Sequence, residues 1–243
     1  MSFRKGFDIA LPLPSLIGSV SNNYLDINKR DILLFFRGTG VRDLQYHTSL
    51  RKAATQLSLY NKKIIIELRY RSSGQFYGIL PNKWNVSKYG YVGKSNFQIN
   101  LVGMKNSIFV LAIRGYGLSS YRLLEALECG AIPVIICDNL VLPYSSDGTT
   151  INWNEISFRF SESYMIEHPK ELVKKLEKLV NEKMNLLLSM QHKGKQVYNK
   201  YLSTHHRHLD RGIEYIPIAL NMTFSNIMKA VHALNFDRQA LDP

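Results

Sequence analysis

A glycine-rich turn between two arginines is the part of the sequence best suited to chemistry. The stretch reads IRGYGLSSYRLLEAL and spans residues 113–127. Gly115 and Gly117 allow a tight turn and a close approach of the backbone to a ligand, and Ser119 or Ser120 is a natural N-cap for a helix that follows. The amides and the positive dipole end of that helix favour an anion. The pattern therefore predicts a phosphate-binding turn.

Two arginines and a glutamate extend this prediction to a nucleotide. Arg114 and Arg122 carry fixed charge that suits phosphate oxygens. Glu125 lies about 7–9 Å along the helix axis from the two serines, at about 1.5 Å per residue, and a carboxylate accepts hydrogen bonds from both hydroxyls of a diol. A diphosphate at the helix start and a ribose at Glu125 describe a nucleoside diphosphate. The alternative for Arg122 and Glu125 is a surface ion pair of little consequence.

Two familiar phosphate motifs do not fit this turn. The chain has no Gly-x-x-x-x-Gly-Lys-Ser/Thr sequence, so it has no P-loop. The stretch from Gly115 to Ser120 is close to a dinucleotide fingerprint, and Asp138 follows at nearly the distance of a ribose ligand, but the third glycine is missing. We keep NAD binding as the weaker alternative.

Apolar stretches alternate with helix-like stretches around the turn. We expect strands at residues 31–38, 63–68, 107–113, 131–137 and 156–160, an edge strand at 8–14, helices at 43–57, 96–104 and 120–129, and a long loop at 69–93. Strands that are apolar throughout indicate an α/β fold with a Rossmann-like, doubly wound parallel sheet. Ligands of such sheets bind at the carboxyl ends of the strands, where residues 114–120 lie.

The rest of the chain is predicted to belong to the same domain. We expect a Rossmann-like, nucleotide-binding core at residues 1–165 and helices at 166–243 that pack on it, with a break near Asn181. Apolar residues at Leu172, Leu176 and Leu179 have the spacing of a helix that packs on a sheet. Cys129 and Cys137 are predicted to be buried thiols and not a disulfide.

The charge of the chain favours anionic partners. Its 243 residues carry a net charge of +12, and the 45% of hydrophobic residues suffice for a large core. Aromatic and basic residues alternate within 69–93, which suits a sugar groove or single-stranded nucleic acid, although no nucleic-acid-binding module is present.

His205, His206 and His208 lack the companion ligands of a zinc site, so we interpret them as a solvated segment. No metal site or metal motif is predicted.

The order of these motifs resembles the exostosin family, glycosyltransferase family 47, from about residue 8 to residue 202. The resemblance is carried by Arg114-Gly115, Ser120-Tyr121-Arg122-Leu123-Leu124-Glu125-Ala126-Leu127, Gly130-Ala131-Ile132-Pro133-Val134, Leu142-Pro143-Tyr144 and Trp153-Asn154. It implies the fold of the C-terminal, donor-binding half of a GT-B glycosyltransferase. It also implies that Arg37, Arg114 and Arg122 hold the diphosphate of a UDP-sugar and that Glu125 holds the ribose.

The resemblance further implies an inverting transfer to a glycan acceptor, which the positive charge suggests is anionic. The chain has no Asp-x-Asp motif, so we expect arginines and a helix end, without a metal or other cofactor, to stabilise the leaving UDP. No residue is assigned as the catalytic base. The acceptor-binding half is expected elsewhere, and the chain is either a fragment, one part of a split enzyme or a minimal version that a partner chain completes. The alternative is a non-catalytic module that binds a polyanion or nucleic acid, or a pseudoenzyme partner that keeps the fold.

The family resemblance implies the Golgi or the endoplasmic reticulum. The longest apolar runs are of strand length, and the first residues lack the apolar core of a signal peptide. A cytosolic location is therefore the alternative expectation.

Overall fold

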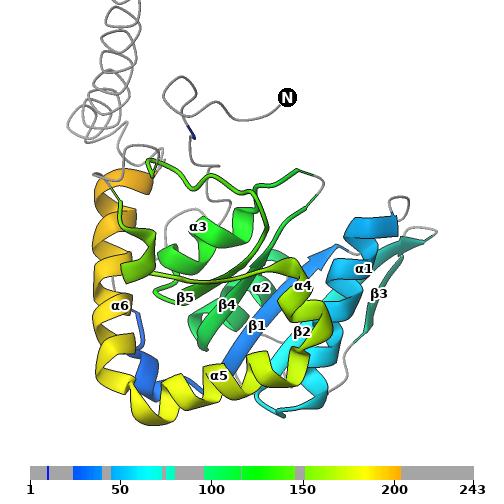
Figure 1. Ribbon diagram of the computed structural model, residues 1–243, viewed down its shortest axis with the longest axis horizontal. Helices are drawn as coiled ribbons and strands as arrows, with labels where there is room; N and C mark the ends of the chain where they lie inside the picture. Colours follow the sequence, from blue (N-terminus) through cyan, green and yellow to red (C-terminus); the bar gives the residue numbers. More distant parts are fainter. Residues whose placement is uncertain are drawn as a thin grey trace, which may run out of the picture.

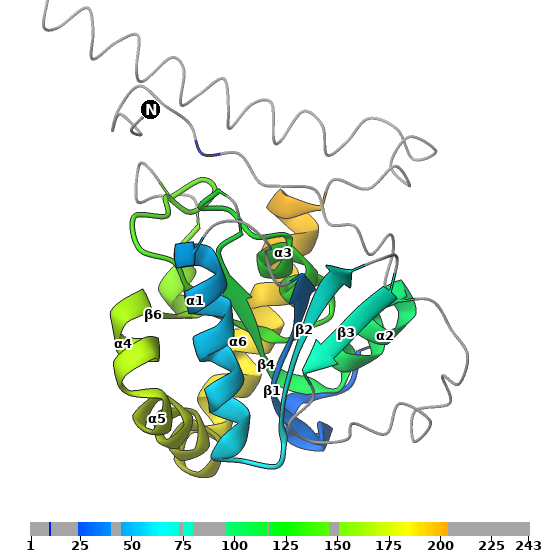
Figure 2. The same ribbon diagram turned by 90° about the vertical axis from the view of Figure 1, so that its right-hand side faces the viewer.

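The computed structural model describes residue 10 and residues 24–39, 45–72, 75–79, 96–115, 117–145 and 151–203. These residues form a sheet with helices on both of its faces (Figures 1 and 2). The edge strand predicted at 8–14, apart from Ala10, lies outside the described residues, as do the three histidines at 205, 206 and 208 and most of the aromatic segment at 69–93.

Six strands form the sheet in the order β3-β2-β1-β4-β5-β6. The strands are β1 (Ile32–Thr39), β2 (Ile64–Ser72), β3 (Gln75–Ile79), β4 (Ser107–Ile113), β5 (Ile132–Ile136) and β6 (Phe158–Phe160). All neighbours pair in parallel except β2 and β3. The predicted Rossmann-like α/β fold is confirmed. The chain runs outward from β1 to β2 and returns to the other side of β1 at β4, so the topological switch point lies between β1 and β4.

The prediction of a loop at 69–93 is wrong for residues 69–72 and 75–79. β2 continues to Ser72 and pairs in antiparallel fashion with β3, with Tyr70 opposite Tyr77 and Ser72 opposite Gln75. Aromatic residues favour strands, and the Ser-Gly pair at 73–74 is the length of a tight hairpin connection. Residues 69–72 and 75–79 therefore belong to paired strands and not to a loop.

Helices cover the sheet in two groups. The helices are α1 (Gln45–Ala54), α2 (Asn96–Lys105), α3 (Tyr121–Glu128), α4 (Glu162–Glu167), α5 (Pro169–Glu182) and α6 (Met184–Val197), with short turns η1 (Ile27–Lys29), η2 (Thr55–Leu59), η4 (Trp153–Glu155) and η5 (Tyr198–Leu202). Side chains of α1, α5 and α6 share one core cluster, and those of α2 and α3 lie in clusters on the other face of the sheet. The helices predicted at 43–57, 96–104 and 120–129 are confirmed within the described residues, while the domain boundary at 165 stays a prediction.

The break between α5 and α6 lies at Lys183 and not at the predicted Asn181. Lys183 has φ −131° and ψ 31°, which ends α5, and its amide still donates to the Leu179 carbonyl. Leu179 and Val180 both pack against the core, so α5 continues through Asn181. The C-cap of α5 is therefore Lys183, two residues beyond the predicted break at Asn181.

Alternate residues of each central strand face opposite layers of the core. In β1, Leu34 and Phe36 pack with α1, α5 and α6, whereas Phe35 packs with Met104 of α2 and Ala126 of α3. All three β1 residues are buried. Burial on both faces explains why the strands are apolar throughout instead of alternating with polar residues.

The C-terminal end of α3 is bound by three buried side chains. Arg30 donates to the carbonyl of Cys129 (2.9 Å), Gln191 of α6 donates to that of Gly130 (2.9 Å), and Lys195 donates to that of Glu128 (2.6 Å). Cationic groups at a helix C-terminus satisfy unpaired carbonyls and complement the dipole. α3 is therefore held firmly at the end that faces away from the glycine-rich turn.

Gly103→Ala is expected to destabilise the fold because the new methyl group would overlap the ring of Phe35, which has no room to move in the core. We expect a loss of about 1–3 kcal/mol in the free energy of unfolding, measured by urea denaturation. Gly117→Ala is the matched control, since a Cβ there meets nothing within 4 Å. An equal loss in both variants would contradict this account of the α2–β1 contact.

Candidate functional site

Charged side chains gather at the carboxyl edge of the parallel sheet. They come from several helices and strand ends, and they are Arg37 of β1, Arg51 of α1, Glu67 of β2, Arg114 after β4, Arg122 and Glu125 of α3, Asp138 after β5 and Glu162 of α4. This edge is the usual ligand-binding edge of a doubly wound sheet. The structure thus brings the predicted arginines together with charged residues that sequence reasoning did not identify.

Arg37 is held in a buried pair at the end of the sheet. Its Nε donates to Oε2 of Glu67 on the neighbouring strand at 2.6 Å, and its Nη1 donates to Oδ1 of Asn100 on α2 at 3.3 Å. Arg37 and Glu67 are also register partners in β1 and β2, and both are buried. A buried ion pair with further hydrogen bonds has a fixed geometry. The sequence indicated Arg37 but not its two partners.

Arg122 ties α3 to β1 across the switch point. Its Nε donates to the Arg37 carbonyl at 3.0 Å, and its Nη1 forms an ion pair with Oε2 of Glu125 one turn further along α3. Glu125 is only 2% exposed. The alternative of a surface ion pair is therefore wrong: the pair is largely buried where α3 meets β1.

Three guanidinium groups converge at this point. Burial, and then the nearby charges of Arg51 and Arg37, lower the pKa of Arg122 to about 10. Arg51 lies 5.8 Å above the Phe36 ring, its Nη2 donates to the Arg114 carbonyl at 3.4 Å, and burial lowers its pKa too. Cations that are brought together out of water repel each other, so an anion bound among them would be stabilised.

Sequence reasoning did not identify Arg51, because the pattern at residues 43–57 predicted a helix without assigning a role to its charged residues. A signal was nevertheless present. Arg51 directly follows Leu50 and precedes Ala54 by one helical turn, and both of these residues are buried. A long cationic side chain next to the apolar stripe of a helix can reach the end of the sheet while its stem remains covered.

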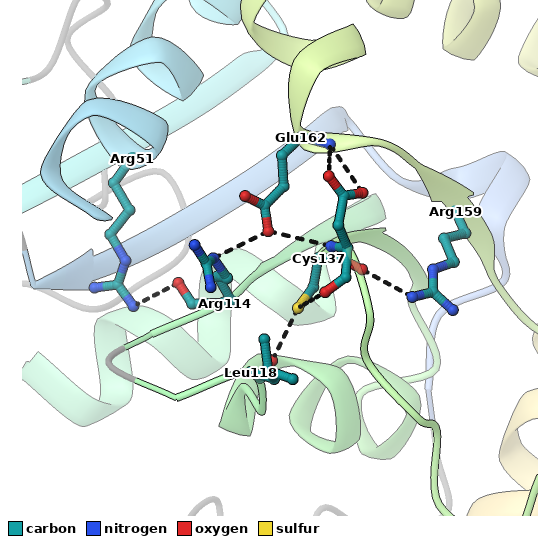
Figure 3. A network of polar contacts seen from close by, with 7 residues as sticks. Arg51, Arg114, Leu118, Cys137, Arg159 and Glu162 are labelled. Carbon is teal, nitrogen blue, oxygen red and sulfur yellow. Dashed lines mark hydrogen bonds and ion pairs between the residues drawn. The ribbon is translucent and has the colours of Figure 1, made fainter. Parts of the chain in front are cut away.

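Arg114 belongs to a second network at the ends of β4, β5 and β6, shown in Figure 3. Its Nε lies 3.0 Å from Oε1 of Glu162, and that same oxygen accepts from the amide of Asp138 at 3.1 Å. The amide of Arg114 donates to the Ile136 carbonyl at 3.3 Å. Backbone and side chain of Arg114 are therefore both fixed.

The predicted helix start is confirmed at Ser120. This residue is the N-cap of α3 in an extended conformation (φ −135°, ψ 128°), although its side chain makes no capping hydrogen bond. Ser119 and Ser120 line a pocket of about 230 Å³, whose other lining residues are Ala10, Leu123, Leu124, Leu140, Val141 and Pro143. A Cβ at Gly115 would lie 3.4 Å from Nη2 of Arg51, and the space beside Gly117 is open. The turn therefore borders both the guanidinium groups and the pocket.

The two cysteines are free and buried, as predicted. Burial raises the pKa of the Cys129 thiol to about 12 and that of Cys137 to about 11. The thiolate is the reactive form of cysteine. Cys137 therefore serves as a small buried residue beside the Arg114 network and not as a nucleophile.

The family model named "Exostosin GT47 domain" matches residues 1–176. The chain belongs to the exostosin GT47 family. It is 27% identical over 221 residues to an "Exostosin-1 homolog" of Caenorhabditis elegans, a match that covers 83% of the chain and 50% of that protein. It is 26% identical to "Exostosin-1" of Drosophila melanogaster, covering 70% of the chain and 22% of that protein.

A plant relative extends the comparison. The chain is 28% identical over 156 residues to the "Probable glucuronoxylan glucuronosyltransferase IRX7" of Arabidopsis thaliana, covering 61% of the chain and 28% of that protein. This exostosin GT47 chain thus spans half or less of the length of these relatives. The family is one of glycosyltransferases. Within the described residues, no helix has the length and apolar character needed to cross a membrane.

Arg37→Ala is expected to lower the free energy of unfolding by about 3–5 kcal/mol, because it leaves the buried carboxylate of Glu67 without its cation. Urea denaturation at neutral pH measures the loss. The matched control is Lys174→Ala, which breaks an exposed pair with Glu171 and should leave the free energy of unfolding almost unchanged. A small loss in the Arg37 variant would show that the Arg37–Glu67 pair does not support the sheet edge.

Proposed function

We propose that the chain binds a UDP-sugar at the carboxyl edge of its sheet and takes part in sugar transfer to a glycan. The observation that carries the proposal is the convergence of Arg37, Arg51 and Arg122 at the switch point, beside the start of α3. A diphosphate supplies the negative charge that these guanidinium groups favour. Membership of the exostosin GT47 family supports a sugar nucleotide as the ligand.

The diphosphate is proposed to contact Arg37, Arg114 and Arg122, with Arg51 as a further cation. The helix start at Ser119 and Ser120 would add backbone amides and the positive end of the α3 dipole. Gly115 and Gly117 would allow the phosphates to approach the backbone, and the open space beside Gly117 is consistent with this role.

Glu125 is proposed to accept hydrogen bonds from the ribose diol. Its Oε2 is paired with Arg122, and the residue is buried. Ligand binding therefore has to exchange this internal pair for two new ones: Arg122 with the diphosphate and Glu125 with the hydroxyls. The exchange gives Arg122 a new counter-ion and leaves the Glu125 carboxylate hydrogen-bonded by the hydroxyls.

The reaction is proposed to invert the anomeric carbon, as the resemblance implies. The acceptor hydroxyl oxygen attacks the anomeric carbon while the bond between this carbon and the β-phosphate oxygen breaks. The electron pair of the broken bond leaves with UDP. The hydroxyl proton passes to a general base, which we expect from an acceptor-binding half on a partner chain. Arginines and the α3 start would stabilise the charge on UDP without a metal.

A non-catalytic partner subunit that keeps the fold is the second candidate. The chain spans 50% of the nematode relative and 22% of the fly relative. UDP binding without transfer to any acceptor would indicate this role. On the family resemblance we place either role in the Golgi or the endoplasmic reticulum.

Glu125→Ala is expected to weaken UDP binding by at least about tenfold, or about 1.4 kcal/mol, from a micromolar dissociation constant. The same variant should bind inorganic pyrophosphate as well as wild type or better, because pyrophosphate has no ribose and Arg122 has lost its internal partner. Isothermal titration calorimetry with both ligands measures the difference. An equal loss for both ligands would contradict the ribose role, and no binding of UDP to wild type would refute the donor site.

Arg51→Ala is expected to weaken UDP and pyrophosphate alike, by about tenfold, because it removes a cation from the diphosphate site. The salt dependence of the dissociation constant should also become shallower. Lys178→Ala on the exposed face of α5 removes an equal charge away from the site and should change neither affinity. If the Arg51 and Lys178 variants behave alike, Arg51 is not a ligand of the diphosphate.

A further inference from the structure

Glu162 is a buried carboxylate at the first position of α4. Its side chain is 3% exposed, and it faces Arg114 from the other side of the β5 end (Figure 3). Oε1 lies 3.0 Å from Nε of Arg114 and accepts from the amide of Asp138 at 3.1 Å. A buried carboxylate is costly unless it is paired and hydrogen-bonded. Glu162 meets both conditions through groups at the candidate site.

The contact between Glu162 and Asp138 is reciprocal. The amide of Glu162 points at Oδ1 and Oδ2 of Asp138, at 3.3 and 3.4 Å, while the amide of Asp138 donates to Glu162. Arg159 of β6 adds a hydrogen bond to the Cys137 carbonyl at 2.9 Å. These contacts join the carboxyl ends of β5 and β6 and fix the Glu162 backbone, so the carboxylate that meets Arg114 is itself held in place.

The ion pair engages Arg114 at Nε, at the inner edge of the guanidinium group. A guanidinium has five N–H donors in a rigid plane, and a bidentate contact to phosphate uses one edge of that plane. Glu162 acts on the guanidinium by charge, as an ion pair, and not through a hydrogen bond from Nε. This attraction restrains where the guanidinium group lies and thereby the direction of its terminal nitrogens. The backbone of Arg114 is fixed as well, by its amide to Ile136 and its carbonyl to Arg51.

We infer that Glu162 is a positioning residue for the donor diphosphate and acts on it through Arg114. The inference rests on the proposed function, because it assumes that Arg114 contacts the diphosphate. Glu162 does not touch the ligand in this scheme, and its own charge would repel a phosphate. Its effect on affinity is therefore favourable only through the orientation that it gives Arg114, which reduces the ordering required on binding.

The test is a double-mutant cycle on UDP affinity with the full chain, measured by calorimetry. Glu162→Gln should weaken UDP binding about fivefold, since the neutral amide no longer holds Arg114 as an ion pair. Arg114→Ala should weaken it further, and the double variant should bind no more weakly than Arg114→Ala alone. Unchanged or tighter binding by Glu162→Gln, or losses that add in the double variant, would overturn the inference.

Arg159→Gln is the matched control. It removes the hydrogen bond to Cys137 from the same junction and leaves the Arg114–Glu162 pair intact. The inference requires UDP affinity in this variant to remain within about twofold of wild type. A loss equal to that of Glu162→Gln would show that stiffness of the junction, and not the orientation of Arg114, determines affinity.

Glu162→Asp decides the question if Glu162→Gln does not fold. It keeps the charge but withdraws the carboxylate from Arg114 by one methylene group, so UDP binding should again weaken about fivefold, and wild-type affinity would overturn the inference. Failure of the proposed function gives a different result, because wild type itself would then not bind UDP. A wild type that binds UDP and a Glu162 variant that binds it equally well refute the positioning role alone.

Discussion

The fixed position of α3 is the constraint on which the candidate site depends. Arg30, Gln191 and Lys195 bind the carbonyls at its C-terminal end, and the buried clusters on either side of the helix hold its length. Its other end is thereby presented at the switch point between β1 and β4. Arg122 and Glu125 owe their contact with β1 to this placement, because a helix of eight residues that is fixed at one end has little freedom at the other.

The two ends of the sheet use buried cations in different ways. At the amino edge, Arg30 donates to the carbonyls of Leu25, Ser107 and Cys129, so it closes loops and helix ends with neutral acceptors. At the carboxyl edge, arginines also meet carboxylates, as in the pair of Arg122 with Glu125. Ion pairs of this kind can change partners when another anion arrives, whereas backbone carbonyls cannot be replaced without loosening the fold. The first edge is suited to stability and the second to recognition.

The sequence predicted the parts of this arrangement that are local. Residues 107–137 revealed a strand, a tight turn, an N-cap at Ser120 and a helix end at Gly130, because periodicity and cap chemistry act over a few neighbours. It did not predict that Arg51, Glu67 and Glu162 join the predicted arginines, since these residues come together only through the order of the strands. The pairing of β2 with β3 was missed for another reason. The Ser and Gly residues at 72–74 indicated a loop, although the aromatic residues on either side stand opposite each other in the register of two strands. The partners of the buried charges are thus the part that only the folded chain reveals.

The contacts at the C-terminal end of α3 also order the events of biosynthesis. Gln191 and Lys195 are separated from the carbonyls they bind by 61 and 67 residues. At about 5–20 residues per second, the ribosome makes the second of these intervals in about 3 to 13 seconds. During that time the glycine-rich turn and its arginines already exist, but the helix behind them has unsatisfied carbonyls. The C-terminal end of α3 therefore obtains these contacts only when α6 has emerged, well after the residues at the carboxyl edge of the sheet.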